Sequence, residues 1–296
     1  MITPVYIRST ASIHSDGQAQ GNAKRAVEPD YKEVITDAGL RRRMSRAVKM
    51  GVYSALTCLA DTSSDSVGGI ITATGLGCLA DTEKFMKSIV DNNEQLLTPT
   101  PFIQSTFNTI GGQVALLRKI HAYNVTYVHR ALSVESALID AVMHIAEGAD
   151  NILLGAVDEI TESSVDIQQR MGMLRNNAAG EGSQFFLLSR NSNGCVAQIT
   201  DISTRRGAIT QTDFATWVDS FLSNNNVDKT DLVVLNGSKQ VLTNAIDFKN
   251  QCGEYFTAVA FALWQAVEQI KSGARNVLIA NSFQNTNHSL ILIKAL

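Results

Sequence analysis

AVMHIAEGADNILLG (141–155) and AVEQIKSGARNVLIA (266–280) are two copies of one pattern within this chain. Seven of their fifteen positions are identical, and extending both copies back by ten residues gives ten identities in twenty-five. Each copy predicts a helix that ends at a glycine, Gly148 or Gly273, and a strand that follows it. Chance similarity between two αβ units is the alternative interpretation, but it leaves the shared glycine and the flanking strands unexplained.

The two predicted helices, 131–147 and 256–272, are apolar around most of their circumference, which is typical of buried helices. The strands after them, 151–157 and 276–283, are continuous apolar runs, as in a sheet covered on both faces. Further apolar strands flank the two copies: VTYV (125–128), SQFFLLS (183–189), DLVVLN (231–236) and SLILIKAL (289–296). We therefore predict an α/β fold of two duplicated halves, with sheets stacked on both sides of the two helices.

The first copy is preceded by a longer stretch of chain. Residues 33–60 and 80–97 are predicted to be helical, and GGIITATGLG (68–77) is predicted to be a strand that enters a glycine-bearing turn. This turn lacks the lysine and the spacing of a P-loop, so nucleotide binding is not expected. Arg41–Arg43 and Arg46 form a basic segment, and its simplest interpretation is a solvated helix face.

Composition limits the classes of protein to which this chain can belong. It has 296 residues, four prolines and none after Pro101, and 18% of its residues are charged, whereas roughly 25% is typical. With 45% hydrophobic residues, we expect a large core and a surface that includes a face covered by a partner. The net charge of −3, without a basic stripe, argues against nucleic acid as the main partner.

Targeting and metal-binding signals are also lacking in the sequence. No apolar run reaches the roughly 18 residues of a membrane-spanning helix, and MITPVYIRST (1–10) lacks the pattern of a signal peptide. The four cysteines are far apart and form no CxxC pair: Cys58, Cys78, Cys195 and Cys252. We expect reduced thiols in the cytoplasm, no bound metal and no cofactor.

Several stretches resemble the β-ketoacyl synthase family, whose members have the thiolase fold. NVTYVHRALSVESALIDAVMHIAEGADNILLGAVDE (124–159) is similar to the family's nucleophile region, in which a catalytic cysteine lies at the N-terminus of a buried helix. The other matching stretches follow in the family's order: GEGSQFFLLSR (180–190), DLVVLNGS (231–238), DFKNQCGEYFTAVAFALWQAV (247–267) and NSFQNTNHSLILI (281–293). The resemblance implies a thiolase-like α/β/α/β/α fold forming a single domain (1–296), with an N-terminal half 1–198 and a C-terminal half 199–296.

The catalytic residues of that family are replaced in this chain. The family's cysteine falls on Ala131, and a methyl group cannot be acylated as a helix-activated thiolate can. Its two histidines fall on Asn236 and Glu254, and an ionised Glu254 would repel the enolate that they stabilise in the family. Lys249 is retained, but only thirteen positions separate it from Asn236, so a segment between these motifs is missing. The resemblance therefore predicts a pseudoenzyme with no catalytic residues.

Four other side chains are candidates for the vacated pocket: His129, Ser133, Cys252 and Phe283. The sequence has no GxSxG elbow and no recognisable Ser–His–acid spacing. For His129 the simpler interpretation is a hydrogen bond to a turn, and for Cys252 it is an inert apolar side chain. Lys249 and Glu254 would either pair with each other or fill the pocket with charge.

The resemblance implies a partner subunit as the first functional hypothesis. The chain is most similar to chain-length-factor subunits, which pair with a working ketosynthase through a two-fold interface and shape the tunnel for the acyl chain. We therefore expect an active ketosynthase and acyl carrier protein as partners, in fatty acid or polyketide-type biosynthesis. Segment 101–120, with Phe102, Phe107 and Met143, is expected to contribute tunnel or interface positions, and ordinary core packing is the alternative for these side chains.

Two further hypotheses remain open from the sequence. One is an enzyme of the same fold with altered thioester chemistry, a hydrolase or a decarboxylase, which would use His129, Glu254 or Cys252. The other is a homodimer that binds acyl chains or carrier protein without catalysis. Whether the chain forms homodimers or heterodimers is not decided by its sequence.

Overall fold

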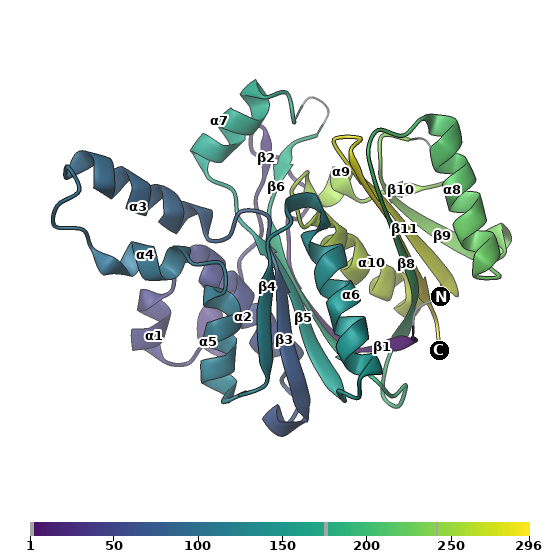
Figure 1. Ribbon diagram of the computed structural model, residues 1–296, viewed down its shortest axis with the longest axis horizontal. Coiled ribbons are helices and arrows are strands. Elements are labelled where there is room, and N and C mark those ends of the chain that lie inside the picture. Colours follow the sequence, from purple (N-terminus) through teal and green to yellow (C-terminus); the bar gives the residue numbers. More distant parts are fainter. Residues whose placement is uncertain (1–2, 175–176, 241) are drawn as a thin grey trace.

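The computed structural model describes residues 3–174, 177–240 and 242–296, and within these ranges ten strands form one sheet. The strand order is β10-β9-β11-β12-β8-β1-β7-β5-β3-β4 (Figure 1). The strands of the N-terminal half are β1 (Val5–Ile13), β3 (Val67–Ala73), β4 (Tyr123–Tyr127), β5 (Asn151–Asp158) and β7 (Gly182–Ser189). Those of the C-terminal half are β8 (Ala197–Arg206), β9 (Leu232–Gly237), β10 (Ile246–Asp247), β11 (Asn276–Phe283) and β12 (Asn287–Lys294).

The two halves of the sheet repeat one topology. The order β4-β3-β5-β7-β1 in the first half matches β10-β9-β11-β12-β8 in the second. They are joined where Val5–Ile7 of β1 pairs with Ala197–Ile199 of β8. Because β8 begins at Ala197, the division predicted at residue 198 falls inside this strand. A separate parallel pair is formed by β2 (Ala23–Lys24) and β6 (Ala179–Gly180).

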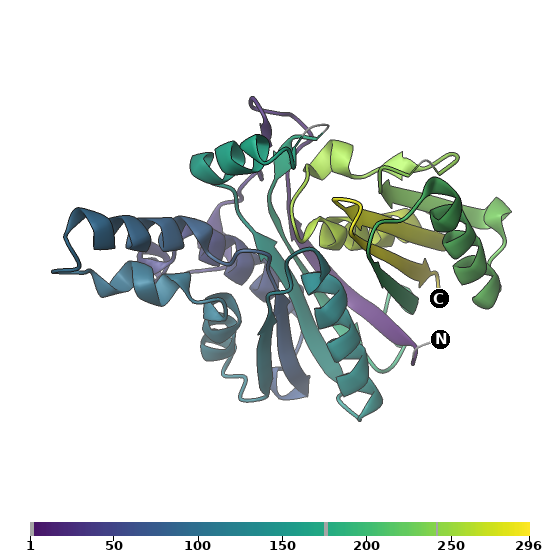
Figure 2. The same cartoon turned by 45° about the horizontal axis from the view of Figure 1, so that its top comes forward.

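Helices lie between the two half-sheets and outside them (Figures 1 and 2). In the N-terminal half they are α1 (Ala38–Arg43), α2 (Arg46–Cys58), α3 (Leu79–Asp91), α4 (Pro99–Ser105), α5 (Thr109–Arg118), α6 (Ser133–Ala146) and α7 (Glu162–Arg170). In the C-terminal half they are α8 (Gln211–Asn224), α9 (Lys249–Cys252) and α10 (Ala258–Lys271). Short 3₁₀ turns are η1 (Tyr31–Glu33), η2 (Ser64–Ser66), η3 (Arg130–Leu132) and η4 (Lys229–Asp231). In both views, α3 and α4 extend away from the body of the protein.

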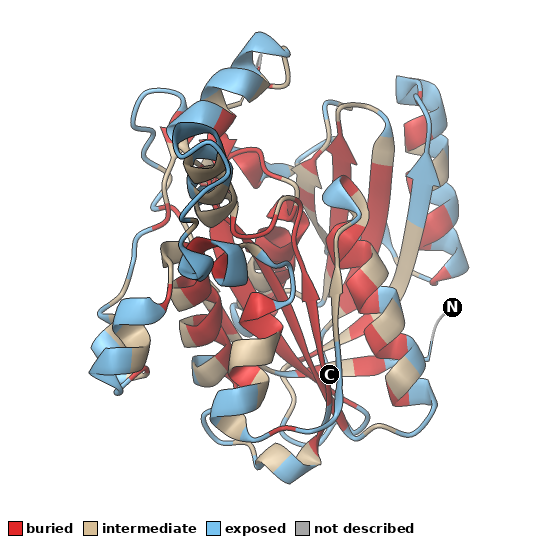
Figure 3. Ribbon diagram, turned by 60° about the vertical axis from the view of Figure 1, so that its left-hand side comes forward, coloured by how far each residue is buried: buried red, intermediate tan, exposed pale blue. Residues whose placement is uncertain are grey.

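The central layer consists of α6 and α10, the two helices of the internal repeat. Leu138 of α6 and Leu263 of α10 are completely buried, and both belong to one core that includes Ile152 of β5 and Ile279 of β11. Figure 3 shows this concentration of buried residues in the central helices and strands. Since both half-sheets pack against these helices, the predicted sheet–helix–sheet centre is confirmed.

The outer layers complete the α/β/α/β/α arrangement. On the N-terminal half, α2 and α5 pack over the other face of the sheet, where Val114 of α5 lies in one core with Leu153 and Phe185. On the C-terminal half, α8 places Phe214 against Leu278. The thiolase-like fold class predicted from the sequence is therefore confirmed.

The glycines predicted to end the repeated helices do so in left-handed backbone conformations. Gly148 has φ of +116° and Gly273 has φ of +105°, values that strain any residue with a side chain. They allow the chain to leave each central helix and enter β5 or β11 within a few residues.

Two helix predictions upstream of the repeat were wrong in extent. The helix predicted over 33–60 is interrupted between α1 and α2, where Met44 is extended and its side chain is buried in the core under α2. The helix predicted over 80–97 ends at Asp91, because Asn93, Glu94 and Leu96 all have positive φ. Met1 and Ile2, the first two residues of the stretch 1–10, lie outside the described residues.

The basic segment is only partly a solvated face. Arg42 and Arg43 are exposed, as predicted, but the Arg46 guanidinium forms two 2.7 Å hydrogen bonds to the buried carboxylate of Glu181. Glu181 also accepts the backbone N–H groups of Ala26 and Ile160. The Gly-Glu-Gly entry to β7 therefore holds α2 against the sheet.

Candidate functional site

A cavity of about 380 Å³ lies where β9, β11 and α9 meet. Its walls come from the turn after β9, the turn after β11, α9 and the segment before β6. The lining residues are Met173, Asn177, Gly237, Ser238, Lys239, Asp247, Lys249, Asn250, Glu254, Ser282, Gln284 and Asn285. Among the positions predicted from the sequence, Lys249 and Glu254 line this cavity, whereas Ala131, His129, Ser133, Asn236, Cys252 and Phe283 do not.

Lys249 and Glu254 form a buried ion pair in the cavity wall. Lys249 Nζ lies 2.9 Å from Glu254 Oε1 and 3.0 Å from Oε2, and it also donates to the backbone oxygen of Ser282 at 3.0 Å. The two residues are only 3% and 8% exposed. Asp247 accepts the N–H of Lys249 and fixes the start of α9. Because Lys249 and Glu254 are paired with each other, neither is available as a histidine-like donor to an enolate.

Ala131, to which the sequence resemblance assigns the cysteine position, has only a methyl side chain. Ala131 lies in η3, just before α6, and is 4% exposed. Arg130 before it has φ of +53°, a conformation uncommon for a residue other than glycine, asparagine or aspartate. The turn therefore keeps a left-handed bend at the helix entrance although no nucleophile is presented there.

Ser133 and His129 hold that turn together and lie outside the cavity. The Ser133 hydroxyl accepts the N–H of His129 at 2.8 Å and donates to the backbone oxygen of Thr74 at 2.8 Å. The ring of His129 contacts Ser136 and lines a separate surface hollow with Arg205 and Arg206. Ser133 therefore stabilises this turn through its hydroxyl, whereas His129 contributes only its backbone N–H and its ring lies at the surface.

The remaining predicted pocket residues have internal partners. The Asn236 amide donates to the backbone oxygens of Ser238 and Gln240, so it stabilises the turn after β9. Cys252 is completely buried, and burial raises the pKa of its thiol far above the ordinary value, which makes it a poor nucleophile. Phe283 packs on Phe256 with ring centroids 4.9 Å apart.

Asp158 connects the two halves of the protein behind this site. Its Oδ1 accepts the hydroxyl of Thr74 and the N–H of Gly75, and its Oδ2 accepts the N–H and the hydroxyl of Thr257. These four contacts are 2.8–3.1 Å long. Burial raises the pKa of Asp158, and the four donors oppose that shift. The turn after β3 and the entrance of α10 are therefore held by one buried carboxyl group.

Sequence reasoning missed a second polar pair, of which one member, Ser282, lines the cavity. Ser282 and His288 are directly opposite in the β11–β12 hairpin, and Ser282 Oγ lies 2.8 Å from His288 Nδ1. The other ring nitrogen, Nε2, lies 2.9 Å from the backbone oxygen of Gly207. The two side chains face each other because of the register of the β11–β12 hairpin, which the sequence pattern alone does not define.

Within the described ranges, no three His, Cys, Asp or Glu side chains are arranged to hold a metal ion. None of the helices of the described ranges combines the length and the apolar character that crossing a membrane requires.

Comparison with known proteins gives a family and a fold. Residues 16–170, more than half of the chain, match the model of the β-ketoacyl synthase N-terminal domain. No curated protein sequence matches the chain. Among solved structures, the chain is similar to the ishigamide ketosynthase/chain length factor, with a TM-score of 0.80, 14% identity and 99% of each chain covered.

Two further structures are similar over all of both chains. One is AntDE:AntF (apo), a type II PKS acyl-carrier protein in complex with its ketosynthase bound to the hexaketide, with a TM-score of 0.81 and 14% identity. The other is a β-ketoacyl synthase from Burkholderia phymatum STM815, with a TM-score of 0.75 and 14% identity. At this identity the likeness shows the fold.

Proposed function

Because this chain belongs to the β-ketoacyl synthase family, we propose that it is a non-condensing member that pairs with an active ketosynthase and shapes its acyl tunnel. The observation that carries the proposal is the cavity wall formed by the ion pair of Lys249 and Glu254. Condensation needs a thiolate to hold the acyl group and donors to stabilise an enolate. This chain has Ala131 at the first position and a carboxylate at the second.

A surface suited to a partner subunit lies at the edge strand β4. In the described sheet β4 pairs only with β3, and an edge strand leaves backbone groups available to a second chain. Next to it, Tyr123 of β4 and the α6 residues Ile139 and Met143 are 40%, 40% and 55% exposed. We propose that a ketosynthase covers this edge, which would also account for the low charge of the chain.

The projecting segment α3–α4 supports a role next to the partner's tunnel. Phe102 and Phe107 are 54% and 51% exposed, so they are not the ordinary core residues of the alternative interpretation. Phe102 packs on Phe85 of α3 with ring centroids 5.3 Å apart, and Ile103 beside it is also exposed. Exposed aromatic and aliphatic side chains on a projecting helix pair favour contact with a partner or with an acyl chain.

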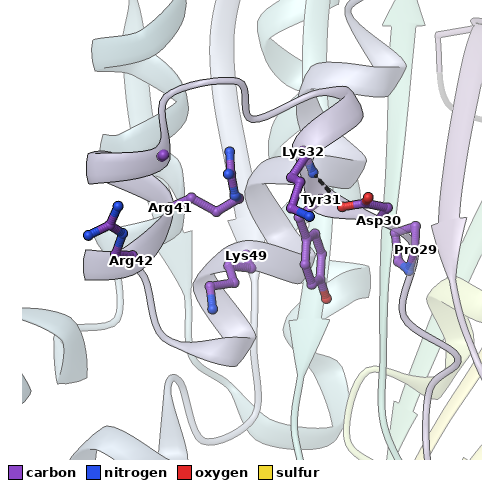
Figure 4. Close-up of a pocket in the computed structure, with 8 residues that line it drawn as sticks. Pro29, Asp30, Tyr31, Lys32, Arg41, Arg42 and Lys49 are labelled. Atoms are coloured by element: carbon purple, nitrogen blue, oxygen red, sulfur yellow. Dashed lines mark hydrogen bonds between the residues drawn. The ribbon is translucent and has the colours of Figure 1, made fainter.

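A basic hollow of about 370 Å³ on the N-terminal half supports the proposed contact with acyl carrier protein. Figure 4 shows Lys32, Arg41, Arg42 and Lys49 around it, contributed by η1, α1 and α2. Four cations around one concavity would attract an acidic protein surface and steer its approach. We place the protein in the cytoplasm, since its four cysteines are free thiols and reduced thiols persist there.

Co-expression with any ketosynthase that is encoded beside this chain tests the pairing. We expect a stable 1:1 complex by size-exclusion chromatography with light scattering, and we expect Met143→Asp to abolish it, since a charge would be buried in the interface. Ile167→Asp, a substitution at a residue of α7 that is 56% exposed and belongs to neither β4, α6 nor the α3–α4 segment, is the matched control. If the wild-type chain forms only homodimers, the homodimeric acyl- or carrier-binding alternative replaces this proposal.

Incubation with malonyl and acyl thioesters tests the lack of condensation. We expect no condensation product from the wild-type chain and none from Ala131→Cys, because the ion pair of Lys249 and Glu254 remains in place. The geometry does not favour thioester chemistry at His129, Glu254 or Cys252, which are respectively outside the cavity, paired and buried. A condensation product from wild-type protein would contradict the proposal.

A further inference from the structure

Ser282 and His288 are hydrogen-bonded to each other. They have no role in the proposed association with a ketosynthase or in the condensation reaction of the family. Because the backbone oxygen of Gly207 can only accept, the 2.9 Å contact places a hydrogen on His288 Nε2. In a neutral ring Nδ1 then has a free lone pair and accepts the Ser282 hydroxyl at 2.8 Å. Burial lowers the pKa of His288 below its ordinary value, which keeps the ring neutral and able to take a proton.

The pair has the arrangement of an activated nucleophile. A serine is hydrogen-bonded to a base, and the base is oriented by a third group, here the Gly207 carbonyl. Ser282 lines the 380 Å³ cavity, and Lys249 Nζ donates to its backbone oxygen. Ser282 therefore lies in the cavity wall, 7% exposed, and its hydroxyl contacts a base that is 1% exposed and whose tautomer is fixed.

We propose that Ser282 is the nucleophile and His288 the general base of an acyl-transfer site for acyl thioesters. Ser282 Oγ attacks the thioester carbonyl carbon while His288 Nδ1 takes the hydroxyl proton. The C–S bond then breaks, and the thiolate leaves with the proton from His288. Water, activated by the same nitrogen, hydrolyses the serine ester and restores the hydroxyl group.

The chain contains a second Ser–His contact, between Ser12 and His14, that can serve as a control because neither residue lines the cavity. Ser12 Oγ lies 2.9 Å from His14 Nδ1, but it also accepts the side-chain amide of Gln184. The ring of His14 packs on Trp264 with ring centroids 4.4 Å apart. Neither residue lines the cavity of Lys249 and Glu254. Ser12→Ala therefore tests whether a Ser–His contact alone is enough for reactivity.

A fluorophosphonate probe tests the proposed nucleophile, because it forms a covalent bond with activated serines and releases fluoride. We expect a single adduct on the full-length wild-type chain by intact mass, and peptide mapping should place it on Ser282. Ser282→Ala should abolish the adduct, and His288→Gln should slow its formation at least tenfold. Ser12→Ala should leave the rate unchanged. No adduct, an adduct at another residue, or equal labelling of Ser282→Ala would overturn the proposal.

Hydrolysis of hexanoyl-N-acetylcysteamine, followed by thiol release, tests the substrate class. We expect slow turnover that requires Ser282 and falls only when the pH drops below 6.5, because the base must stay unprotonated. Adduct mapping needs no variant, so misfolding of a mutant cannot imitate a positive result. If Ser282 is labelled by the fluorophosphonate but wild-type chain releases no thiol, the acyl-thioester assignment is wrong. Neither assay depends on a ketosynthase partner.

Discussion

The N-terminal and C-terminal halves share their inner layer but differ in their outer one. Between β3 and β4 the chain has three helices, α3, α4 and α5, whereas between β9 and β10 the described residues 238–240 and 242–245 form none. The C-terminal half therefore keeps an open hollow of about 590 Å³ beside Val234 and Leu278. The comparison teaches that the duplicated centre is maintained in both halves, while the projecting helices α3 and α4 belong to the N-terminal half.

Replacing a buried leucine of either central helix by alanine has the largest expected effect on stability, and it tests whether the two halves share their inner layer. Leu138 and Leu263 are repeat counterparts, 125 residues apart, and both are 0% exposed. We expect Leu138→Ala and Leu263→Ala each to lower the free energy of unfolding by about 3 kcal/mol, measured by urea denaturation. Leu116→Ala, at a residue that is 74% exposed, is the control. If only one of the two core variants were destabilised, the halves would not be equivalent at their centre.

The next prediction concerns the contact between the halves. Asp158 accepts four hydrogen bonds, while its counterpart 125 residues later is Phe283, which packs on Phe256. In Asp158→Asn the amide nitrogen cannot accept, so two buried donors lose their partner. We expect a loss of about 2–3 kcal/mol in unfolding free energy. Exposed Asp65→Asn is the control, and equal stability of the two variants would contradict the role of Asp158.

The contrast between the layers also explains what could be predicted from the sequence. Continuous apolar runs and the internal repeat indicate the inner layer directly in the sequence. The bounds of α6, α10, β5 and β11 were therefore predicted to within about two residues. The outer helices were less well predicted, because the interruption at Met44 depends on burial of that side chain against α2. Nothing in the local pattern around residue 44 indicates that contact.

The candidate site was predicted only in part, for a similar reason. The ion pair joins residues five apart across one turn, so Lys249 and Glu254 were correctly considered as a possible pair. His129 and Ser133 were placed in the pocket because they flank Ala131, but their side chains point into the turn and the surface. The contact between Ser282 and His288 depends on the register of the β11–β12 hairpin, which the sequence did not define.

The pH dependence of stability tests a difference between the two central helices, which is the buried carboxyl group of Glu135 in α6. Glu135 of α6 is completely buried and accepts the Ser289 hydroxyl at 2.6 Å, whereas its repeat counterpart in α10 is Ala260. Desolvation by burial raises the pKa of Glu135 to about 7. Its folded-state pKa thus lies above its unfolded value, so the protonated group contributes stability at low pH. That contribution is lost as the pH rises toward 7.

We expect Glu135→Gln to remove roughly 2 kcal/mol of the loss in stability between pH 5 and pH 7. Unfolding free energies from urea titrations at the two pH values measure this difference. Some decline should remain, since burial also raises the pKa of Glu159 to about 7. Glu94→Gln, at an exposed position, should keep the wild-type pH dependence. If Glu135→Gln also kept it, the Glu135 carboxyl would not titrate in this range.

The smallest expected effect is that of Val234→Ala, a substitution beside the open hollow. Comparing it with Ile70→Ala tests the difference between the outer layers of the two halves. Ile70 pairs with Leu153 and Val234 pairs with Leu278, its repeat counterpart, so Ile70 and Val234 occupy equivalent sheet positions. Ile70 is 0% exposed, whereas Val234 is only half-buried. We expect Ile70→Ala to cost about 3 kcal/mol and Val234→Ala less than about 1 kcal/mol, because the shorter side chain leaves no closed cavity there.

The difference in size between isoleucine and valine can be removed with Ile70→Val as the starting protein. A further change of residue 70 to alanine then deletes the same two methyl groups that Val234→Ala deletes. If the helices over β3 make the difference, this deletion should remain more costly at position 70 than at position 234 in urea denaturation. Equal costs would mean that Val234 is covered as completely as Ile70, and that the missing helix has been replaced by another element over β9.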